Sequence, residues 1–398
     1  MKTHSENYDI AIVGAGISGL TMAFKIAQSG KKVILLESKE KAGGCLNTLY
    51  GADDFWVEMG AHTFYSSYTN VIDLIQGAGL ESDIVAREKL SMKLFTDKHE
   101  KIFAPLSKLE LFGNLPKLFV SKRHGKTVKE YFSNVLGKKN YDKVFTRMFS
   151  AVIVQNADNF SAEYFLKRRK TKSKHHPKSF ILRKGMSSLS AAILKHENIT
   201  VVYKQNVNTI AKSDGYTIST VDGETYSSKD LAFAVSPKHV ASLLKDINPK
   251  LSELLSEFPI QNIESTGLIL EKEKPGVEPL TFVIPLQGAC YSMVTRDVLT
   301  DEKYRGFAFH FEENDITNGE QIGTMAELLS VSQSELSPIT KANHTLPLIK
   351  TGHQDRMSEI KSEAEKSGVY LTGNYFKGLS LEDCVERSNQ EAQRYLGN

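Results

Sequence analysis

Two short hydrophobic runs stand near the start of the chain, and a glycine-rich turn follows the first of them. Residues 10–13 read Ile-Ala-Ile-Val, and residues 33–36 read Val-Ile-Leu-Leu. Continuous apolar runs of this length are typical of strands buried on both faces of a parallel sheet. With a helix between the two runs, the pattern predicts a strand, helix, strand unit.

Hydrophobic and polar positions alternate in other parts of the chain. Residues 91–95, 266–270 and 307–311 follow this period of two, which predicts strands with one buried face. Residues 71–77 instead predict a helix that stops at the Gly-Ala-Gly sequence of residues 77–79. The expected fold class is therefore α/β, with a mixed antiparallel sheet in addition to the parallel one.

The turn after the first run has the spacing of a dinucleotide-binding loop. Gly14, Gly16 and Gly19 would give, in order, a tight turn, room for a pyrophosphate against bare backbone, and close packing of the helix on the sheet. The N-terminus of that helix presents unpaired N–H groups to phosphates. Glu37 ends the second strand, where a carboxylate can accept hydrogen bonds from a ribose but disfavours a 2′-phosphate. The bound dinucleotide should therefore not be NADP.

The next segment, Lys41-Ala-Gly-Gly-Cys-Leu-Asn-Thr48, indicates which dinucleotide is bound. With it the chain resembles the flavin amine oxidase superfamily, which includes monoamine oxidases, protoporphyrinogen oxidases and phytoene desaturases. The resemblance implies FAD. Relatives usually carry an arginine where this chain has Lys41, which keeps the charge but lacks the bidentate fork. Gly43 and Gly44 would let backbone amides approach the pyrophosphate from its second side.

Further matches extend the resemblance to both ends of the chain. They are the segments 56–64, which relatives place at the flavin ring, 180–189, 206–208, where a valine backbone clamps the adenine, and 368–385, whose helix N-terminus meets the ribityl phosphate and the flavin. The resemblance implies cofactor contacts from Gly14, Ala15, Gly16, Ser18, Gly19, Glu37, Ser38, Lys41, Gly43, Gly44, Gly60, Ala61, His62, Val207, Gly373, Asn374, Leu379, Ser380 and Leu381.

The sequence of the C-terminal loop resembles protoporphyrinogen oxidases more than monoamine oxidases. Amine oxidases of the superfamily usually place an aromatic residue after the glycine of this loop, whereas Gly378 is followed here by Leu379, which offers no π face to an amine. Tyr375 could partly substitute as a catalytic-site aromatic, or it could be a core residue. Segments 148–152 and 160–163 also echo protoporphyrinogen oxidases. Lys93 and Lys101 are the candidates for holding a substrate propionate, but a surface position is the favoured interpretation of each.

The resemblance implies that a saturated carbon, next to nitrogen or to a conjugated system, gives a hydride to flavin N5, with reoxidation by oxygen or another acceptor. A porphyrinogen or a related pyrrolic or cyclic amine is the favoured substrate. His62 is a candidate for proton transfer or for packing, and no metal is expected. The alternatives are an amine oxidase or desaturase acting on a small biosynthetic intermediate, a non-redox enzyme resembling UDP-galactopyranose mutase, suggested by the sequence of residues 60–64, and a protein that keeps FAD without catalysis.

The positions of the flavin motifs predict the domain organisation. Residues 1–85, 180–262 and 355–398 are expected to form a discontinuous, Rossmann-like FAD-binding domain of the glutathione reductase type. Residues 86–179 are expected to form a helical, basic cap, and residues 263–354 an antiparallel-sheet substrate domain.

Composition and charge indicate where in the cell the protein is expected and point to a basic surface segment. The 398 residues are 40% hydrophobic, with no apolar run long enough to span a membrane and a polar N-terminus unlike a secretory signal. Three scattered cysteines favour a reducing cytoplasm without disulfides. Although the net charge is only +3, residues 167–178 hold seven Lys or Arg and no acid. This basic run predicts a solvated loop, or alternatively a contact with an anionic substrate or with the inner face of an anionic membrane. A second basic cluster lies at 117–129. Nucleic acid is not expected, because no stacking aromatics accompany the lysines, and the sequence leaves the oligomeric state open.

Overall fold

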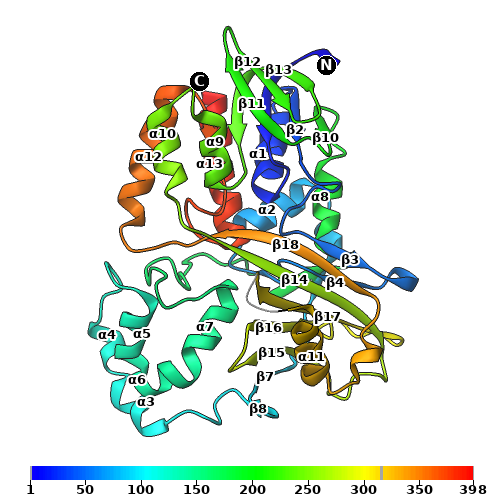
Figure 1. The fold of residues 1–398 in the computed structure, drawn as a ribbon, viewed down its shortest axis with the longest axis vertical. Helices are drawn as coiled ribbons and strands as arrows, with labels where there is room; N and C mark the ends of the chain where they lie inside the picture. Colours follow the sequence, from blue (N-terminus) through cyan, green and yellow to red (C-terminus); the bar gives the residue numbers. More distant parts are fainter. Residues whose placement is uncertain (1, 314–316, 398) are drawn as a thin grey trace.

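The computed structural model describes residues 2–313 and 317–397, and its upper part is built on a seven-stranded sheet (Figure 1). The strand order is β10-β2-β1-β13-β12-β11, and β19 also pairs with β13. The strands are β1 (Lys2–Val13), β2 (Val33–Leu36), β10 (Ile199–Val202), β11 (Val207–Lys212), β12 (Tyr216–Thr220), β13 (Glu224–Phe233) and β19 (Tyr370–Leu371). Since β10, β2, β1, β13 and β19 pair in parallel, the predicted parallel unit is confirmed.

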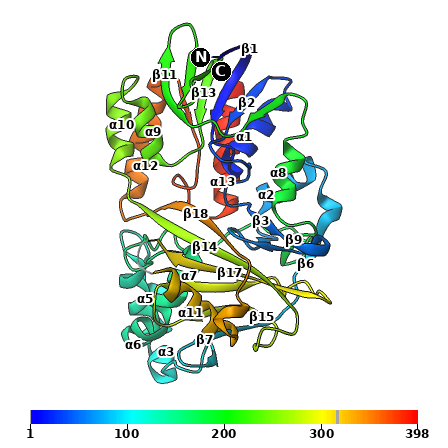
Figure 2. The ribbon, with the colours of Figure 1, turned by 45° about the vertical axis from the view of Figure 1, so that its right-hand side comes forward.

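Helices cover both faces of this sheet (Figure 2). Ile10 and Ile12 of β1 pack on α1 (Ile17–Ala27), α2 (Thr69–Gly77), α8 (Ser187–Ile193) and α13 (Leu381–Gly397). Ala11 and Val13, which point the other way, share a core with α9 (Pro237–Leu244), α10 (Pro249–Ser256) and α12 (His353–Ser367). Burial of each large apolar side chain contributes about 1.5–3 kcal/mol. This two-sided burial explains why β1 and β2 read as continuous apolar runs.

A second seven-stranded sheet lies below, with the order β18-β14-β17-β16-β15-β7-β8. Its elements are β7 (Ser91–Phe95), β8 (His99–Lys101), β14 (Ile260–Glu271), β15 (Leu280–Pro285), β16 (Cys290–Thr295), β17 (Tyr304–Glu312) and β18 (Ile339–Pro347), and α11 (Asn318–Leu329) packs against it. β14 and β17 pair antiparallel, as the alternating positions predicted. One expectation is wrong: β7 was placed at the start of the helical cap, but it pairs in parallel with β15 in this sheet. Its alternating pattern predicted a strand but carried no information about its partner.

The helices within residues 108–153 form a helical layer beside the second sheet, at the lower left of Figure 1. Its helices are α3 (Lys108–Asn114), α4 (Lys117–Val120), α5 (Val128–Leu136), α6 (Lys138–Asn140) and α7 (Thr146–Ile153), with a π-helical turn at Tyr141–Phe145. Their core is aromatic and includes Phe132, Phe149 and Phe165. Small strands β3 (Thr48–Tyr50), β4 (Trp56–Glu58), β5 (Phe64–Tyr65), β6 (Ile84–Ala86) and β9 (Ser179–Leu182), and 3-10 turns at Ala52–Asp54, Glu81–Asp83 and Gln333–Glu335, complete the fold. Within the described residues, the structure has no helix that is both long and apolar enough to cross a membrane.

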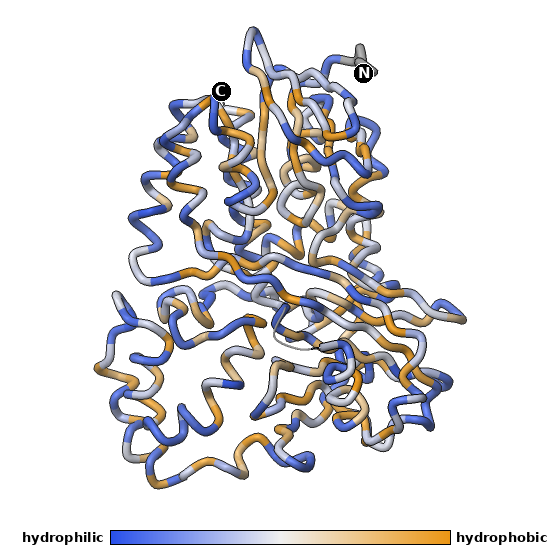
Figure 3. Tube along the Cα trace, in the orientation of Figure 1, coloured by the Kyte–Doolittle hydropathy of each residue, from blue (hydrophilic) through white to orange (hydrophobic). Residues whose placement is uncertain are grey.

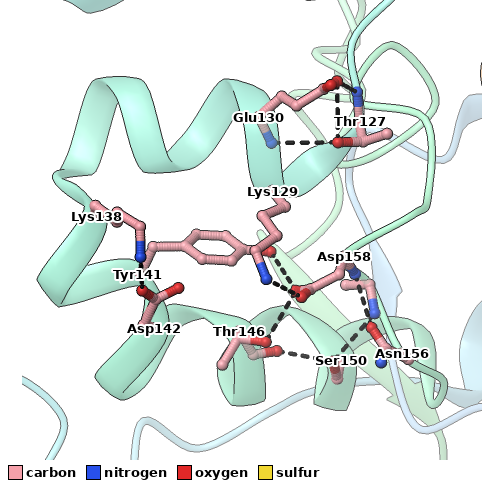
Figure 4. A network of polar contacts seen from close by, with 11 residues as sticks. Thr127, Lys129, Glu130, Lys138, Tyr141, Asp142, Thr146, Ser150, Asn156 and Asp158 are labelled. Carbon is pink, nitrogen blue, oxygen red and sulfur yellow. Dashed lines mark hydrogen bonds and ion pairs between the residues drawn. The ribbon is translucent and has the colours of Figure 1, made fainter.

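A polar network fixes the helical layer around Asp158 (Figure 4). Its carboxylate accepts hydrogen bonds from Lys129 Nζ at 2.9 Å, Tyr141 Oη at 2.8 Å and Thr146 Oγ1 at 3.0 Å. Partial burial opposes ionisation, but these donors together hold the pKa of Asp158 below its ordinary value. The carboxylate therefore joins α5, the π-helical turn and α7.

We predict that Asp158→Ala lowers the free energy of unfolding by about 1–3 kcal/mol, because three donors lose a charged acceptor. The wild-type contribution should be present above about pH 3.9, the usual pKa of an unfolded Asp, and be lost as the pH falls through the lower folded-state pKa. Asp142→Asn is the matched control, since its pair with Lys138 is exposed and worth less than about 1 kcal/mol. Urea unfolding monitored by circular dichroism measures both. Equal effects of the two substitutions would contradict the role given to Asp158.

Candidate functional site

The turn after β1 requires glycine at two positions. Gly14 has a φ of +99°, and a Cβ built on it would lie 2.8 Å from the Ala234 carbonyl oxygen. A Cβ on Gly19 would lie 2.0 Å from the Gly14 carbonyl oxygen. The first glycine therefore provides the turn, and the third provides the close approach of α1 to it, as the spacing predicted.

A second glycine segment lies directly against this turn. The Gly43 amide donates to the Ala15 carbonyl at 2.8 Å. A Cβ on Gly44 would lie 3.0 Å from the Cα of Gly16, so the two chains approach with bare backbone on both sides. This arrangement has the form expected for amides reaching a diphosphate from two directions.

Glu37 lies at the carboxyl end of β2, beside the glycine turn. Its carboxylate accepts from the Ala15 amide at 2.8 Å and from the Lys39 amide at 2.9 Å, and the Ser38 hydroxyl lies 3.4 Å away. Lys41, by contrast, is exposed and does not line the neighbouring cavity. Its side chain is therefore on the surface, outside the lining of this cavity.

A cavity of about 690 Å³ lies between the carboxyl ends of the parallel strands and the β14–β18 edge of the second sheet. Of the residues predicted to bind the cofactor, it is lined by Gly14, Gly16, Ser18, Glu37, Ser38, Gly44, Gly373, Asn374 and Leu379. Cys45, Asn206 and Cys384, which lie in the matched segments, also line it. So do residues that were not predicted individually as cofactor contacts: Ile17, Lys39, Ala234 to Pro237, His239, Ile260, Asn262, Glu313 and Asn343 to Pro347. Those on β14 and β18 follow no motif, and only the pairing of the two strands brings them to the cavity.

The remaining predicted cofactor residues lie behind the cavity wall or beside it. Ala15, Gly19 and Gly43 form the backbone of the two glycine segments. Gly60 and Ala61 pack on the loop at Cys45, whose carbonyl accepts from the Ala61 amide at 2.8 Å. Val207 is buried in the core, and its neighbour Asn206 reaches the cavity.

The last two predicted cofactor residues begin the C-terminal helix. Ser380 Oγ donates to Asp383 at 2.7 Å and accepts from Arg169 at 2.8 Å. Leu381 is the buried first residue of α13. Neither is among the residues that line the cavity.

His62 forms part of a cluster of histidines that the sequence did not predict as a unit. Its Nε2 lies 2.8 Å from the Nε2 of His310, whose Nδ1 lies 2.9 Å from Ser265 Oγ. Burial, reinforced by neighbouring cations and imidazoles, lowers the pKa of His62 well below its ordinary value and that of His310 to about 3. Burial likewise lowers the pKa of His344 to about 4. All three imidazoles are therefore neutral at physiological pH.

Tyr375 is a core residue. Its ring is fully buried against Phe258 and Phe376, and its hydroxyl has no hydrogen-bond partner among the described residues. The core alternative therefore describes this tyrosine, and no aromatic side chain from this loop lines the cavity.

For Lys93 and Lys101 the structure favours the surface alternative, and for the basic run it corrects the prediction. Lys93 and Lys101 lie on β7 and β8, at the edge of the second sheet opposite to β18, and so do not line the cavity. The basic run is not uniformly solvated: Lys167 and Arg169 pair with the buried carboxylate of Asp383 at 3.5 and 3.1 Å. The other five cations of the run, Arg168, Lys170, Lys172, Lys174 and Lys178, are exposed.

A buried carboxylate supports the wall behind Gly60. Glu58 accepts from the Met186 amide at 2.7 Å and from Thr48 Oγ1 at 3.0 Å. Thr48 also exchanges two hydrogen bonds with Ser187, so this network ties the segment 180–189 to the strand pair β3–β4. Burial raises the pKa of Glu58 to about 8, although its hydrogen bonds partly oppose the rise. Among the described residues, no group of three or more His, Cys, Asp or Glu side chains could hold a metal ion.

We predict that Glu58 makes the protein less stable as the pH rises. Between the ordinary pKa of 4.5 and about 8, the folded carboxyl keeps a proton that the unfolded chain has lost. The contribution of Glu58 to stability should therefore fall across this window by up to about 1.4 kcal/mol per pH unit, and above about pH 6.5 the buried histidines no longer add a slope of the opposite sign. Glu58→Gln should remove this slope in urea unfolding measured across the window, while Glu40→Gln, at a fully exposed carboxylate, should retain it. A wild-type slope that survives in Glu58→Gln would contradict the prediction.

Comparison with known proteins gives the family. Residues 17–269 match the family model described as "Flavin containing amine oxidoreductase". The 15-cis-phytoene desaturase of Narcissus pseudonarcissus is 36% identical over 80 residues, which are 20% of this chain and 14% of that protein. The chain thus matches a small part of the length of such curated relatives.

Two solved structures show the shared fold over nearly the whole chain. The "Putative protoporphyrinogen oxidase" from Exiguobacterium sp. 255-15 has a TM-score of 0.81 and 17% identity, with 100% of both chains covered. The CLA-producing fatty acid isomerase from P. acnes has a TM-score of 0.75 and 15% identity, with 98% of both chains covered. Since the family model covers more than half of the chain, this protein belongs to the family of flavin-containing amine oxidoreductases and is an FAD-dependent enzyme.

Proposed function

We propose that this enzyme is an oxidase or dehydrogenase that removes a hydride from a carbon of a porphyrinogen or of a related pyrrolic or cyclic amine. The observation that carries the proposal is that the C-terminal loop contributes no aromatic side chain to the cavity. Leu379 lines it, and the aromatic ring of Tyr375 is buried away from it in the core. The cage that orients small amines in amine oxidases therefore has no counterpart on this loop.

The cavity fits the FAD that the family uses. The backbone of Gly14, Gly16 and Gly44, which lines the cavity and carries no side chain, would lie along the diphosphate. Glu37 and Ser38 would hold the ribose, and Asn206 with the backbone of Val207 would contact the adenine. On the opposite wall, Gly373, Asn374 and Leu379 would face the flavin. The remaining predicted contacts, apart from Lys41, would act by shaping these loops.

This assignment supports a Rossmann-like, discontinuous FAD-binding domain of the glutathione reductase type, made of residues 1–85, 180–262 and 355–398. The cavity lies at the carboxyl ends of β1, β2, β13 and β19, the edge at which open α/β sheets bind ligands. The helical layer would then be the cap, and the second sheet, with β7 and β8 added, the substrate domain.

When bound, FAD supplies a hydride acceptor at N5. The residues of this chain would supply position and a proton acceptor. Oxidation of a C–H next to an N–H releases a hydride with its electron pair and one proton, and a neutral imidazole can take that proton. His62 is the group that we assign to this role: it is hydrogen-bonded to His310 and through it to Ser265. It lies outside the cavity lining, and its lowered pKa makes it a weak base in the resting protein. Oxygen or another acceptor would take the electrons in a second half-reaction.

A second candidate function is desaturation of a conjugated, apolar substrate. It is supported by the 36% identity of an 80-residue stretch to a 15-cis-phytoene desaturase and by Leu379, which packs at the junction of the cavity and the helical layer. The non-redox alternative, resembling UDP-galactopyranose mutase, would require flavin that is reduced before turnover.

We predict that Gly19→Ala weakens FAD binding at least about tenfold, because the new Cβ would overlap the Gly14 carbonyl and displace the turn. Gly319→Ala, in α11 with open space around it, is the matched control and should bind FAD normally. The ratio of flavin to protein absorbance after gel filtration, and titration of the stripped protein with FAD, measure the effect. Full retention of FAD by Gly19→Ala would contradict the proposed site.

We predict that the FAD-loaded enzyme oxidises a porphyrinogen in air, seen as growing porphyrin fluorescence with release of peroxide. The same protein should leave putrescine unchanged. Gly19→Ala without FAD controls for spontaneous oxidation. Turnover of phytoene in place of the porphyrinogen would favour the second candidate, and conversion of UDP-galactopyranose only after reduction by dithionite would replace both.

A further inference from the structure

One surface outside the FAD cavity concentrates exposed apolar side chains. The described residues include thirteen exposed large hydrophobic side chains, and six of them fall between residues 103 and 120. The six, which we call the apolar ridge, are Phe103 (70% exposed), Leu109 (89%), Phe112 (67%), Leu118 (40%), Phe119 (92%) and Val120 (78%). Single exposed hydrophobic residues are normal, but a cluster of this kind marks an interaction surface.

The ridge projects from a backbone that is tied to the rest of the molecule. Ser107 caps α3, and its amide donates to the Asn140 side chain at 2.7 Å. Ile102 and Leu106 point inward and are buried with Val144. Within α3 and α4, both fully described, no residue is buried. The apolar side chains are therefore left largely uncovered by the described chain, and α3 and α4 lie at the outer lower edge of the molecule (Figure 1).

Cations border the ridge, and no free carboxylate accompanies them. Lys101, Lys108, Lys117 and Lys122 are exposed. The one acidic residue between 101 and 126 is Glu110, and its carboxylate turns inward to accept from the amides of Lys139 and Asn140, both at 2.9 Å. Hydrophobic and hydrophilic stretches alternate along this part of the chain in Figure 3.

We propose that the apolar ridge docks this protein on an anionic membrane surface without crossing it. Apolar side chains of a short helical segment enter the boundary between headgroups and acyl chains, and flanking lysines meet the anionic headgroups. A second copy of the chain fits less well, because a two-fold contact through the ridge would bring its lysines against the same lysines. The proposal does not depend on the substrate assigned above.

The apolar ridge is a better candidate for membrane contact than the basic run of residues 167–178. Two cations of the run, Lys167 and Arg169, are engaged by Asp383, and the one large hydrophobic exposed beside it is Leu166. The ridge combines charge with apolar groups that can insert. We therefore assign the proposed membrane contact to residues 101–122 instead of residues 167–178.

The test is sedimentation of the FAD-loaded full chain with vesicles of phosphatidylcholine alone or mixed with phosphatidylglycerol. We expect binding to the mixed vesicles, weaker binding to the neutral ones, and loss of binding as salt is added. Phe112→Ser combined with Phe119→Ser should weaken binding about tenfold or more, since two large apolar groups no longer insert. Unchanged flavin content and circular dichroism would show that this variant is folded.

Two control variants separate the ridge from other surfaces. Val221→Ser combined with Leu396→Ser removes exposed hydrophobic groups elsewhere and should bind like the wild type. Lys172→Ser combined with Lys174→Ser, in the basic run, should weaken binding far less than the ridge variant. The proposal is overturned if wild-type protein ignores both vesicles, if the basic-run variant alone loses binding, or if analytical ultracentrifugation finds a dimer that the ridge variant dissociates.

Discussion

The close contact between two glycine segments is the constraint on which the site depends. The turn at Gly14–Gly19 and the loop at Gly43–Gly44 are joined by the hydrogen bond from Gly43 to Ala15, and their backbones approach without side chains between them. Because the two segments follow β1 and β2, which pair in parallel, this contact depends on the register of these two strands. The cavity, the position of Glu37 and the approach of the C-terminal helix all follow from it.

The second sheet contributes side chains to the site, whereas the glycine segments offer only backbone. β14 and β18 close the cavity with polar side chains, and His310 of β17 reaches His62 across the boundary between the sheets. Burial keeps these imidazoles neutral, so they add no positive charge to this part of the molecule. With Leu379 in place of an aromatic residue, the site is better suited to an apolar ring than to a small cation.

The sequence predicted the parts of the fold that depend on local pattern. Apolar runs gave β1 and β2, alternation gave β14 and β17, and the glycine spacing gave the turn whose tight contacts exclude side chains. The sequence did not predict contacts between residues that are far apart in the chain. The pairing of β7 with β15, the partnership of His62 with His310 and the capture of Arg169 by Asp383 join residues far apart in the chain, and no local signal marks them. Lys41 shows the reverse case, since a motif placed it at the cofactor and its side chain lies on the surface.

Hydrogen exchange of individual amides, compared between the stripped and the FAD-loaded protein, tests the central claim most directly. If FAD lies between the two glycine segments and the C-terminal loop, the amides of residues 14–19, 43–45 and 373–381 gain protection together when it binds. Protection confined to other segments, with exchange at these three unchanged, would contradict the account.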